Sequence, residues 1–149
     1  RRDHIYRLYY MSKPVTGAAA MILFEQGKLD LAESVSSYLP AFSGQMVEEN
    51  GRLVPAEREV TVKDLLGMTS GLVYNGNQGP AGEYATEVFN QVDERLLTAQ
   101  AMTTVEIAEA LGRGPLKFHP GTSWLYGTSA DVLGAVIEAA SGMTFGAFL

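Results

Sequence analysis

The segment from Tyr9 to Phe24 constrains the fold of this chain more than any other stretch. It reads Tyr-Tyr-Met-Ser-Lys-Pro-Val-Thr and continues as an apolar run. Pro14 fits the first turn of a helix, where backbone N–H groups have no intrahelical acceptor to lose, and Gly27 is typical of a position just after a helix. The pattern predicts a helix over about 11–26, with apolar residues at helical spacing on its buried side: Ala18, Ala19, Ile22 and Leu23.

Position 10 and Lys13 lie near the start of this predicted helix and, three residues apart, share one face. Free N–H groups and the positive end of the helix dipole stabilise a developing anion there, which suits acyl chemistry. A serine at position 10 would complete Ser-x-x-Lys, in which the amine takes the hydroxyl proton. The chain has Tyr10 instead. The plain alternative for Lys13 is a solvated lysine, poorly placed against the dipole.

Length and composition indicate a single folded piece, residues 1–149,. The chain is 46% apolar and 19% charged, and its net charge of −6 argues against a nucleic-acid partner,. The longest apolar run is too short to span a bilayer, and no signal peptide is visible, which slightly favours the cytoplasm and leaves the compartment open. There is no cysteine, and His4 and His119 lack metal-ligand spacing, so we expect neither a metal nor a cofactor,.

Apolar periodicity and turn residues predict a mostly helical chain with one hairpin and one further short strand. Asn50-Gly51 is typical of a tight hairpin turn. Thr61 with Asp64, and Thr103 with Glu106, resemble capping boxes that open helices. The expected elements are a strand end over 5–9, a helix over 31–39 stopped by Pro40, a hairpin over 46–54, a short helix after 61, a loop over 71–82, and helices over 83–100, 103–112 and 129–140.

Tyr126 is the second candidate for chemistry, in Pro-Gly-Thr-Ser-Trp-Leu-Tyr-Gly-Thr-Ser just before the last predicted helix. A tyrosine on such a loop is more often a packing residue, but beside a cation it can shuttle protons. Lys13 is the cation we nominate for that role. Trp124 either lines an acyl pocket or belongs to the core.

Four stretches resemble, in order and spacing, motifs of the serine β-lactamase and penicillin-binding-protein superfamily, closest to its class C-like esterases and D-aminopeptidase-type hydrolases. Met11–Thr16 resembles the family's Ser-Met-Thr/Ser-Lys-Pro-Val-Thr segment without its first residue,. The others are Gly27–Leu31 with Tyr38-Leu39-Pro40, then Val62–Leu72, and finally Pro120-Gly121-Thr122 with Tyr126 and Asp131–Gly134. Together they cover almost the whole chain.

This resemblance implies a small-molecule ester or amide substrate, β-lactam-like amides included, and a reaction through an acyl-enzyme. Position 10 would be the acylated nucleophile, and its backbone N–H would form half of the oxyanion hole. Lys13 would be the activating base, and Tyr126 would protonate the leaving group and later activate water. Substrate contacts are expected from Tyr74, Trp124 and Thr128, of which Thr128 with Gly127 replaces the commoner Ser-Asn and fits esterase-like relatives better.

Tyr10 and one missing motif depart from the family pattern. The Tyr10 phenol fills space meant for the acyl group, so we expect impaired activity. Ser12 cannot serve as the nucleophile in its place, because the residue three positions after it is Val15 and not a lysine. The family's C-terminal Lys-Thr-Gly or His-x-Gly strand is absent. The expected fold is therefore mostly α, the helical domain of the α/β (α+β) β-lactamase/transpeptidase-like fold, incomplete and without most of its antiparallel sheet. A second chain or a missing segment would cover the apolar face of the first helix.

Three functions stay open from the sequence. The first is an acyl-transfer hydrolase of esterase or β-lactamase type, silenced by Tyr10. The second is a non-catalytic relative whose pocket binds a ligand or peptide. The third is a helical piece that docks on a partner chain.

Overall fold

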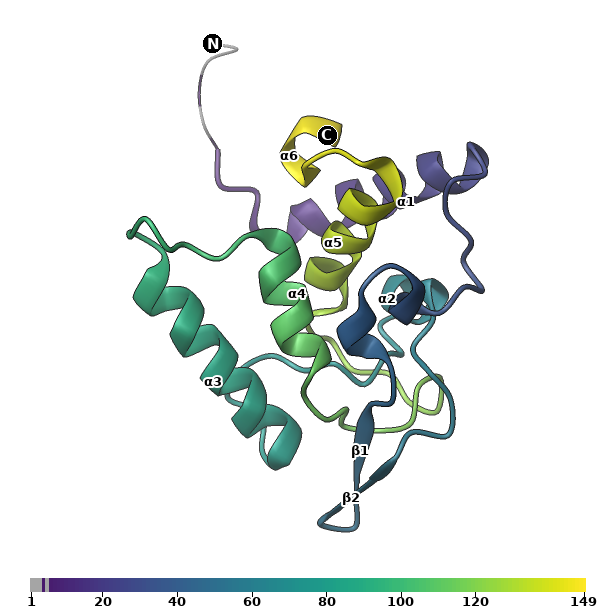
Figure 1. Ribbon diagram of the computed structural model, residues 1–149, viewed down its shortest axis with the longest axis vertical. Coiled ribbons are helices and arrows are strands. Elements are labelled where there is room, and N and C mark those ends of the chain that lie inside the picture. Colours follow the sequence, from purple (N-terminus) through teal and green to yellow (C-terminus); the bar gives the residue numbers. More distant parts are fainter. Residues whose placement is uncertain (1–3, 5) are drawn as a thin grey trace.

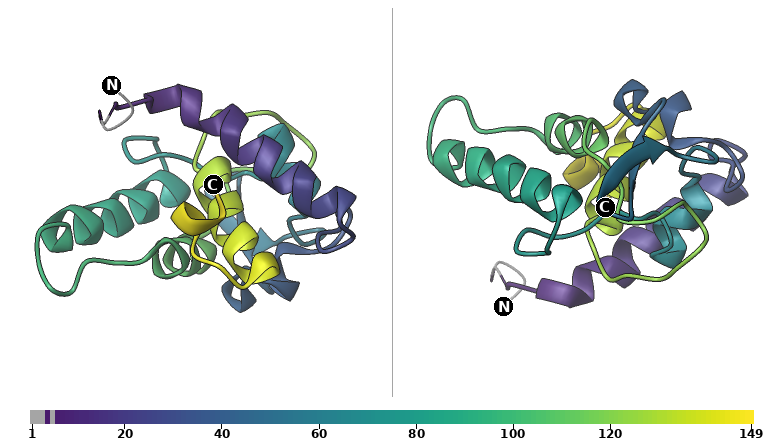
Figure 2. Two further views of the ribbon diagram at one scale, coloured as in Figure 1. Left: turned by 90° about the horizontal axis from the view of Figure 1, so that it is seen from above. Right: turned by 90° about the horizontal axis from the view of Figure 1, so that it is seen from below.

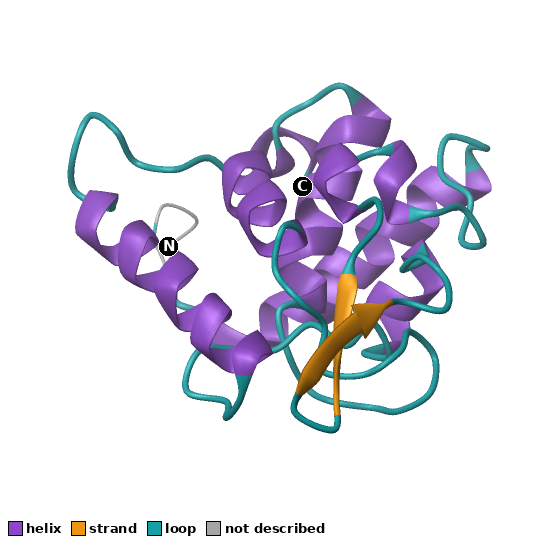
Figure 3. Cartoon of the chain, turned by 60° about the horizontal axis from the view of Figure 1, so that its bottom comes forward, coloured by secondary structure: helices purple, strands orange, loops and turns teal. Residues whose placement is uncertain are grey.

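Helices predominate in the computed structural model, which describes residue 4 and residues 6–149 (Figure 1, Figure 3). In that part of the chain the sheet structure is one antiparallel pair of strands, β1 and β2. In chain order the elements are the 3-10 helix η1 (Tyr9–Met11), α1 (Ser12–Glu25), the 3-10 helices η2 (Val35–Ser37) and η3 (Pro40–Phe42), β1 (Met46–Glu49), β2 (Arg52–Pro55), α2 (Val62–Gly67), α3 (Pro80–Arg95), α4 (Thr104–Gly112), α5 (Ser129–Ser141) and α6 (Phe145–Phe148).

The core is built around α5, which packs against α1, α2, α4 and α6. Neighbouring helices cover most of its circumference and bury five of its apolar side chains: Val132, Leu133, Ala135, Val136 and Ile137,. Gly142 ends the helix in the left-handed conformation at a φ of 71°, as the sequence predicts,. The views along the vertical axis of Figure 1 show α1 running beside α5 (Figure 2).

The first helix has the predicted extent, but its buried side is rotated from the predicted one. Its buried residues are Thr16, Ala19, Ala20 and Leu23. The prediction was therefore right for Ala19 and Leu23 and wrong for Ala18 and Ile22, which are exposed. Apolar residues surround most of this helix, so periodicity alone does not identify the side that meets α5.

Local signals predicted three elements correctly. Asn50 and Gly51 take φ values of 50° and 75° between β1 and β2, as a two-residue hairpin turn requires,. Thr61 and Asp64 form a complete capping box at the start of α2. A second capping box opens α4, in which the Thr103 and Glu106 side chains each bond the other's backbone N–H,.

Three other predictions were wrong. The helix expected over 31–39 is replaced by η2 and η3, because the Val35 backbone N–H donates to the Val60 carbonyl instead of to a helical neighbour. Pro40 accordingly begins η3 instead of stopping a helix. Of the strand expected over 5–9, residue 5 lies outside the described residues, 6–8 have no regular structure and Tyr9 begins η1.

The long helix expected over 83–100 spans Pro80–Arg95, with Pro80 in its first turn,. This helix, α3, packs against α4 at the side of the molecule (Figure 1). Within the described residues, no helix combines the length and the apolar character needed to cross a bilayer,.

Candidate active site

Lys13 lies in the first turn of α1, and its ammonium group is held by tyrosines from two distant loops. Its Nζ donates a hydrogen bond of 2.8 Å to the Tyr74 hydroxyl. The same Nζ lies 5.0 Å from the centre of the Tyr126 ring and 5.4 Å from that of Tyr74, which is cation–π distance in both cases,. The predicted approach of Lys13 and Tyr126 is thus present, as a contact with the face of the ring.

Tyr10 lies at the end of this cluster, in η1. Its side chain is 73% exposed, and its ring meets the Tyr126 ring edge-on, with centroids 5.9 Å apart at 65°,. Within the described part of the chain, no hydrogen bond joins Tyr10 to Lys13. The phenol therefore packs against Tyr126 while the lysine is bonded to Tyr74.

Asp131, in the first turn of α5, is the acidic member of the cluster. The Tyr74 hydroxyl donates to its Oδ2 over 3.4 Å. In the sequence, Asp131 was noted only as part of the Asp131–Gly134 stretch of the family resemblance, with no role of its own. Lys13, Tyr74 and Asp131 thus form one hydrogen-bonded chain across three elements.

The charges in this chain influence one another. Burial works to lower the pKa of Lys13, but the Tyr74 hydrogen bond and the negative charge of Asp131 together raise it above its ordinary value,. Desolvation raises the pKa of Tyr74 against the opposing effect of Lys13. Desolvation also raises the pKa of Asp131, and the lysine offsets part of this rise. Lys13 is therefore a cation and Tyr74 a neutral phenol at neutral pH.

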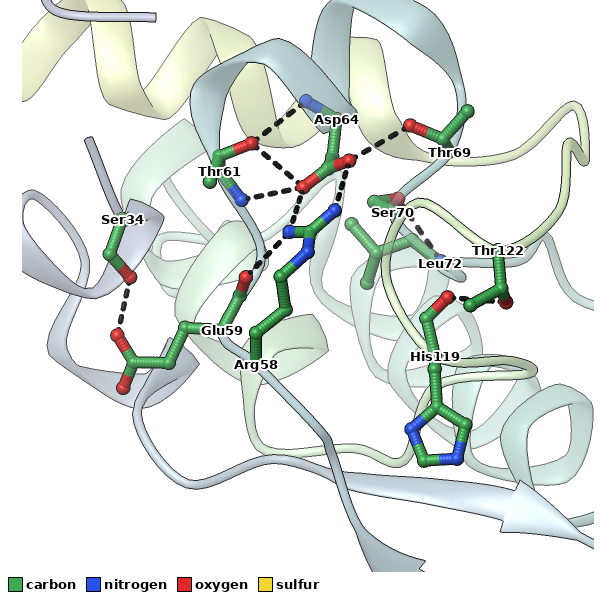
Figure 4. A network of polar contacts seen from close by, with 10 residues as sticks. All are labelled: Ser34, Arg58, Glu59, Thr61, Asp64, Thr69, Ser70, Leu72, His119 and Thr122. Atoms are coloured by element: carbon green, nitrogen blue, oxygen red, sulfur yellow. Dashed lines mark hydrogen bonds and ion pairs between the residues drawn. The ribbon is translucent and has the colours of Figure 1, made fainter. Parts of the chain in front are cut away.

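Thr69, in the loop after α2, is held by a network of polar contacts around Asp64 (Figure 4). Asp64 is 5% exposed and accepts hydrogen bonds from Arg58, Thr61 and Thr69. The Thr69 carbonyl in turn accepts from the Gly121 N–H over 2.8 Å.

Two further backbone bonds join the same loops: Leu125 N–H donates to the Met68 carbonyl over 3.1 Å, and Lys117 N–H to that of Gly71 over 2.8 Å. These bonds hold the loop of Tyr126 beside the loop after α2, which continues to Tyr74. The two rings accordingly lie 5.9 Å apart.

A cavity of about 580 Å³ opens beside the cluster, a volume typical of small-molecule sites,. Its polar end contains Lys13, Tyr74 and Asp131, while α3, α4 and α6 contribute mostly apolar groups. The remaining lining residues are Tyr9, Tyr10, Ser12, Thr16, Phe89, Met102, Thr104, Ile107, Ala130, Gly134 and Phe145. Such a site can hold a ligand with one polar group and an apolar portion.

The predicted substrate contacts are not all at this cavity. Tyr74 lines it. Trp124 is 63% exposed and does not line it, and Thr128 is completely buried, with its hydroxyl 3.5 Å from the Val73 carbonyl. The direction of these two side chains depends on how the loop before α5 is fastened, which their sequence neighbourhood does not encode.

Comparisons with known proteins give one consistent family. The family model described as Beta-lactamase matches residues 1–149. Esterase EstB of Burkholderia gladioli is 32% identical over 148 residues, which is 99% of this chain and 35% of EstB. The lovastatin esterase of Penicillium rubens is 29% identical over 153 residues, or 99% of this chain and 36% of that protein.

Solved structures agree with these sequence matches. EstCE1, a hydrolase with promiscuous acyltransferase activity, superimposes with a TM-score of 0.70 and 28% identity, covering 92% of this chain and 33% of that one. Unliganded simvastatin synthase from Aspergillus terreus, in its selenomethionyl form, superimposes with a TM-score of 0.66 and 29% identity, covering 89% of this chain and 32% of that one. The chain thus spans about a third of the length of the curated relatives it matches.

Proposed function

The chain belongs to the beta-lactamase family, and on that premise we propose that the cluster of Lys13, Tyr126 and Tyr10 is the acyl-transfer site of an esterase-type enzyme. The observation that carries the proposal is the contact of the Lys13 ammonium with the Tyr126 ring beside an open cavity. Relatives named as esterases and acyltransferases support an ester as the substrate class. We extend this class to amides of similar shape.

In the proposed reaction, a hydroxyl at position 10 attacks the ester carbonyl and gives up its proton to neutral Lys13. The bond to the leaving alcohol then breaks as that oxygen takes a proton from Tyr126, which leaves an acyl group on position 10. In the second step water gives a proton to the Tyr126 phenolate and attacks the acyl carbonyl. The bond to the position 10 oxygen then breaks, that oxygen takes its proton back from the Lys13 ammonium, and the acid leaves. The backbone N–H of residue 10 contributes one donor to the oxyanion.

Tyr10 impairs this reaction for a steric and a geometric reason. A phenol oxygen extends much further from the backbone than a serine oxygen and passes the point where a carbonyl would be attacked. The Tyr10 ring also lies edge-on against Tyr126 and itself lines the cavity, so it takes up space beside the position of attack. We therefore propose that the chain with Tyr10 turns over esters slowly or not at all, although a phenolate is a competent nucleophile.

The replacement Tyr10→Ser tests this proposal. We expect hydrolysis of p-nitrophenyl butyrate to rise about 100-fold, the lower range of general acid–base catalysis, and a phosphonate probe to label Ser at position 10 in a mass spectrum. Tyr9→Ser is a matched control, because Tyr9 is similarly exposed, at 71%, and lies in the same 3-10 helix but lacks the lysine spacing. The second control is Lys13→Met in the Tyr10→Ser background, which we expect to lose the gain.

Equal turnover and equal labelling of the Tyr10→Ser and Tyr9→Ser chains, both folded by circular dichroism, would refute the proposed acyl-transfer site. A gain that survives Lys13→Met would refute the role of the lysine.

A second candidate function is favoured by Tyr10 itself. A scaffold that keeps Lys13, Tyr126 and the cavity but places a phenol at the nucleophile position is what a ligand-binding relative without catalysis would contain. Burst acylation of the unchanged chain by an activated ester would eliminate this candidate.

The outer side of α1 supports the proposal that a partner chain or a further segment covers this helix. Val15, Met21, Ile22 and Phe24 are between 38% and 48% exposed there, and an apolar stripe of this kind marks a contact surface. Sedimentation velocity tests the partner-chain form: self-association lost in an Ile22→Glu variant supports it, and a stable monomer at all concentrations contradicts it.

A further inference from the structure

Tyr74 contacts Lys13 in a way that distinguishes it from a simple wall of the cavity. Its hydroxyl accepts a hydrogen bond of 2.8 Å from the Lys13 ammonium and donates a hydrogen bond of 3.4 Å to the Asp131 carboxylate. A phenol that both accepts and donates in this manner has a fixed hydroxyl direction. Its ring also packs against Phe89, with centroids 6.3 Å apart, which restricts the side chain further.

The groups that face the Lys13 ammonium come from three elements besides its own. The loop after α2 provides Tyr74, the loop before α5 provides the Tyr126 ring, and α5 provides Asp131, the one carboxylate among the groups that influence Lys13 in the described residues. Tyr10, on η1, reaches the cluster through the edge of Tyr126. A flexible four-carbon side chain with a half-buried end is thus held from several directions,.

We propose that Tyr74 and Asp131 are positioning residues of this site, which together hold the Lys13 ammonium at the rim of the cavity, against the Tyr126 ring. This inference rests on the proposed function for its catalytic meaning, but the tether is a property of the resting chain. Tyr74 acts through its hydroxyl and Asp131 through that hydroxyl and its charge. This positioning role differs from the substrate contact predicted for Tyr74 from the sequence.

The tether has a consequence for the reaction. An ammonium ion stabilised by an acceptor and a nearby carboxylate gives up its proton only at higher pH. The neutral lysine that the proposed reaction needs is therefore scarce at neutral pH, and a Tyr10→Ser enzyme with this tether will be most active in alkaline buffer. Weakening the tether shifts the rising limb of activity to lower pH and loosens the lysine.

The test uses nuclear magnetic resonance titration of the lysine side chains in the full chain. The sequence has four lysines, Lys13, Lys28, Lys63 and Lys117. Lys28 and Lys63 are exposed and serve as internal references in every sample. The variants are Tyr74→Phe, which removes one hydroxyl, and Asp131→Asn, which removes the charge while keeping the size. Tyr84→Phe is the matched control, because its hydroxyl bonds the Ala110 carbonyl, away from Lys13.

We expect the titration midpoint of Lys13 to fall in Tyr74→Phe and in Asp131→Asn, while Lys28 and Lys63 keep theirs and Tyr84→Phe changes none. In the Tyr10→Ser background, the rising limb of kcat should move to lower pH in parallel, with kcat at its plateau reduced about tenfold as the lysine loses its orientation.

A Lys13 midpoint that stays in place in both variants, with the chain still folded, overturns the tether whatever the activity. If the midpoint moves as expected while Tyr10→Ser remains inert, the tether stands and the proposed acyl-transfer function falls. A purely structural role predicts lower stability without any movement of the Lys13 midpoint, so the two roles are separated by the same spectra.

Discussion

Replacement of Asp64 by asparagine tests how the loop that carries Tyr126 is held in place. Asp64 accepts five hydrogen bonds: two from Arg58, two from Thr61 and one from Thr69. Asparagine has nearly the same shape but a single acceptor oxygen and no charge. Its amide nitrogen would therefore face N–H or O–H donors whose hydrogen bonds the second carboxylate oxygen now accepts. The variant thus breaks the network without opening a cavity.

The size of the effect follows from the pKa of Asp64. Burial alone would raise it, but the hydrogen bonds from Arg58, Thr61 and Thr69 lower it from 3.8 to about 2. A shift of this size corresponds to about 2 kcal/mol of folding free energy. The Arg58 side chain is 45% exposed, so solvent screens part of that pairing, and we expect about 1–2 kcal/mol to depend on the charge,. Unpaired donors add about 1–3 kcal/mol at neutral pH.

The sign of the pH dependence is fixed by the direction of the shift. Because the folded pKa lies below the unfolded one, the charge-dependent stabilisation is complete above about pH 4 and is lost as the pH falls toward about 2,. Urea unfolding followed by circular dichroism at pH 7, 5, 4, 3 and 2 measures it. The unchanged chain should lose about 1–2 kcal/mol more than Asp64→Asn between pH 5 and pH 2.

Asp93→Asn is the control, because Asp93 is exposed on α3 and its charge should matter little. If the unchanged chain and Asp64→Asn lose stability in parallel from pH 5 to pH 2, the Asp64 carboxylate is not the group that holds these loops. A variant as stable as the unchanged chain at pH 7 would contradict the network altogether.

Two further predictions concern backbone positions. Gly71→Ala should lower the free energy of unfolding by at least ~2 kcal/mol more than Gly51→Ala does. Both glycines have positive φ, so backbone strain of about 1 kcal/mol is common to the two variants,. A Cβ at Gly71 would in addition lie 2.6 Å from the Phe118 carbonyl oxygen, whereas a Cβ at Gly51 meets open space. Equal losses in urea unfolding would contradict the close approach. Thr103→Ala should cost about 1 kcal/mol by loss of the capping box with Glu106,; thermal unfolding measures it, and an unchanged midpoint would mean that this box is dispensable.

The elements that the sequence predicted correctly are those fixed by neighbouring residues. Asn50-Gly51 fixes a turn by its own φ preferences, and each threonine cap bonds an acid three positions later,. Such interactions require no knowledge of the rest of the chain. The helices over 11–26 and 129–140 were likewise predicted from features of their own segments, namely apolar residues at helical spacing and a glycine just after each helix,.

The wrong predictions share the opposite property. The apolar residues over 31–39 have helical spacing, but this stretch pairs instead with the segment after Arg58, where Ser34 and Thr61 form an antiparallel bridge. The buried side of α1 is selected by contact with α5, which apolar residues on several sides of the helix do not specify,. Both outcomes depend on partners far along the chain.

The candidate site follows the same division between local and distant contacts. The motif order brought Lys13, Tyr126 and Tyr74 to attention, but the hydrogen bond of Lys13 goes to Tyr74 and its contact with Tyr126 is through the ring face. Asp131 stayed unassigned because its meaning arises only when the loop after α2 approaches α5. Backbone hydrogen bonds join the loops of Tyr74 and Tyr126, and the Asp64 network holds Thr69, whose carbonyl accepts one of them. A substitution at Asp64 should therefore disturb the Lys13 titration as well as stability, although Asp64 touches none of the tyrosines: a network remote from the cavity determines the geometry of the charge within it.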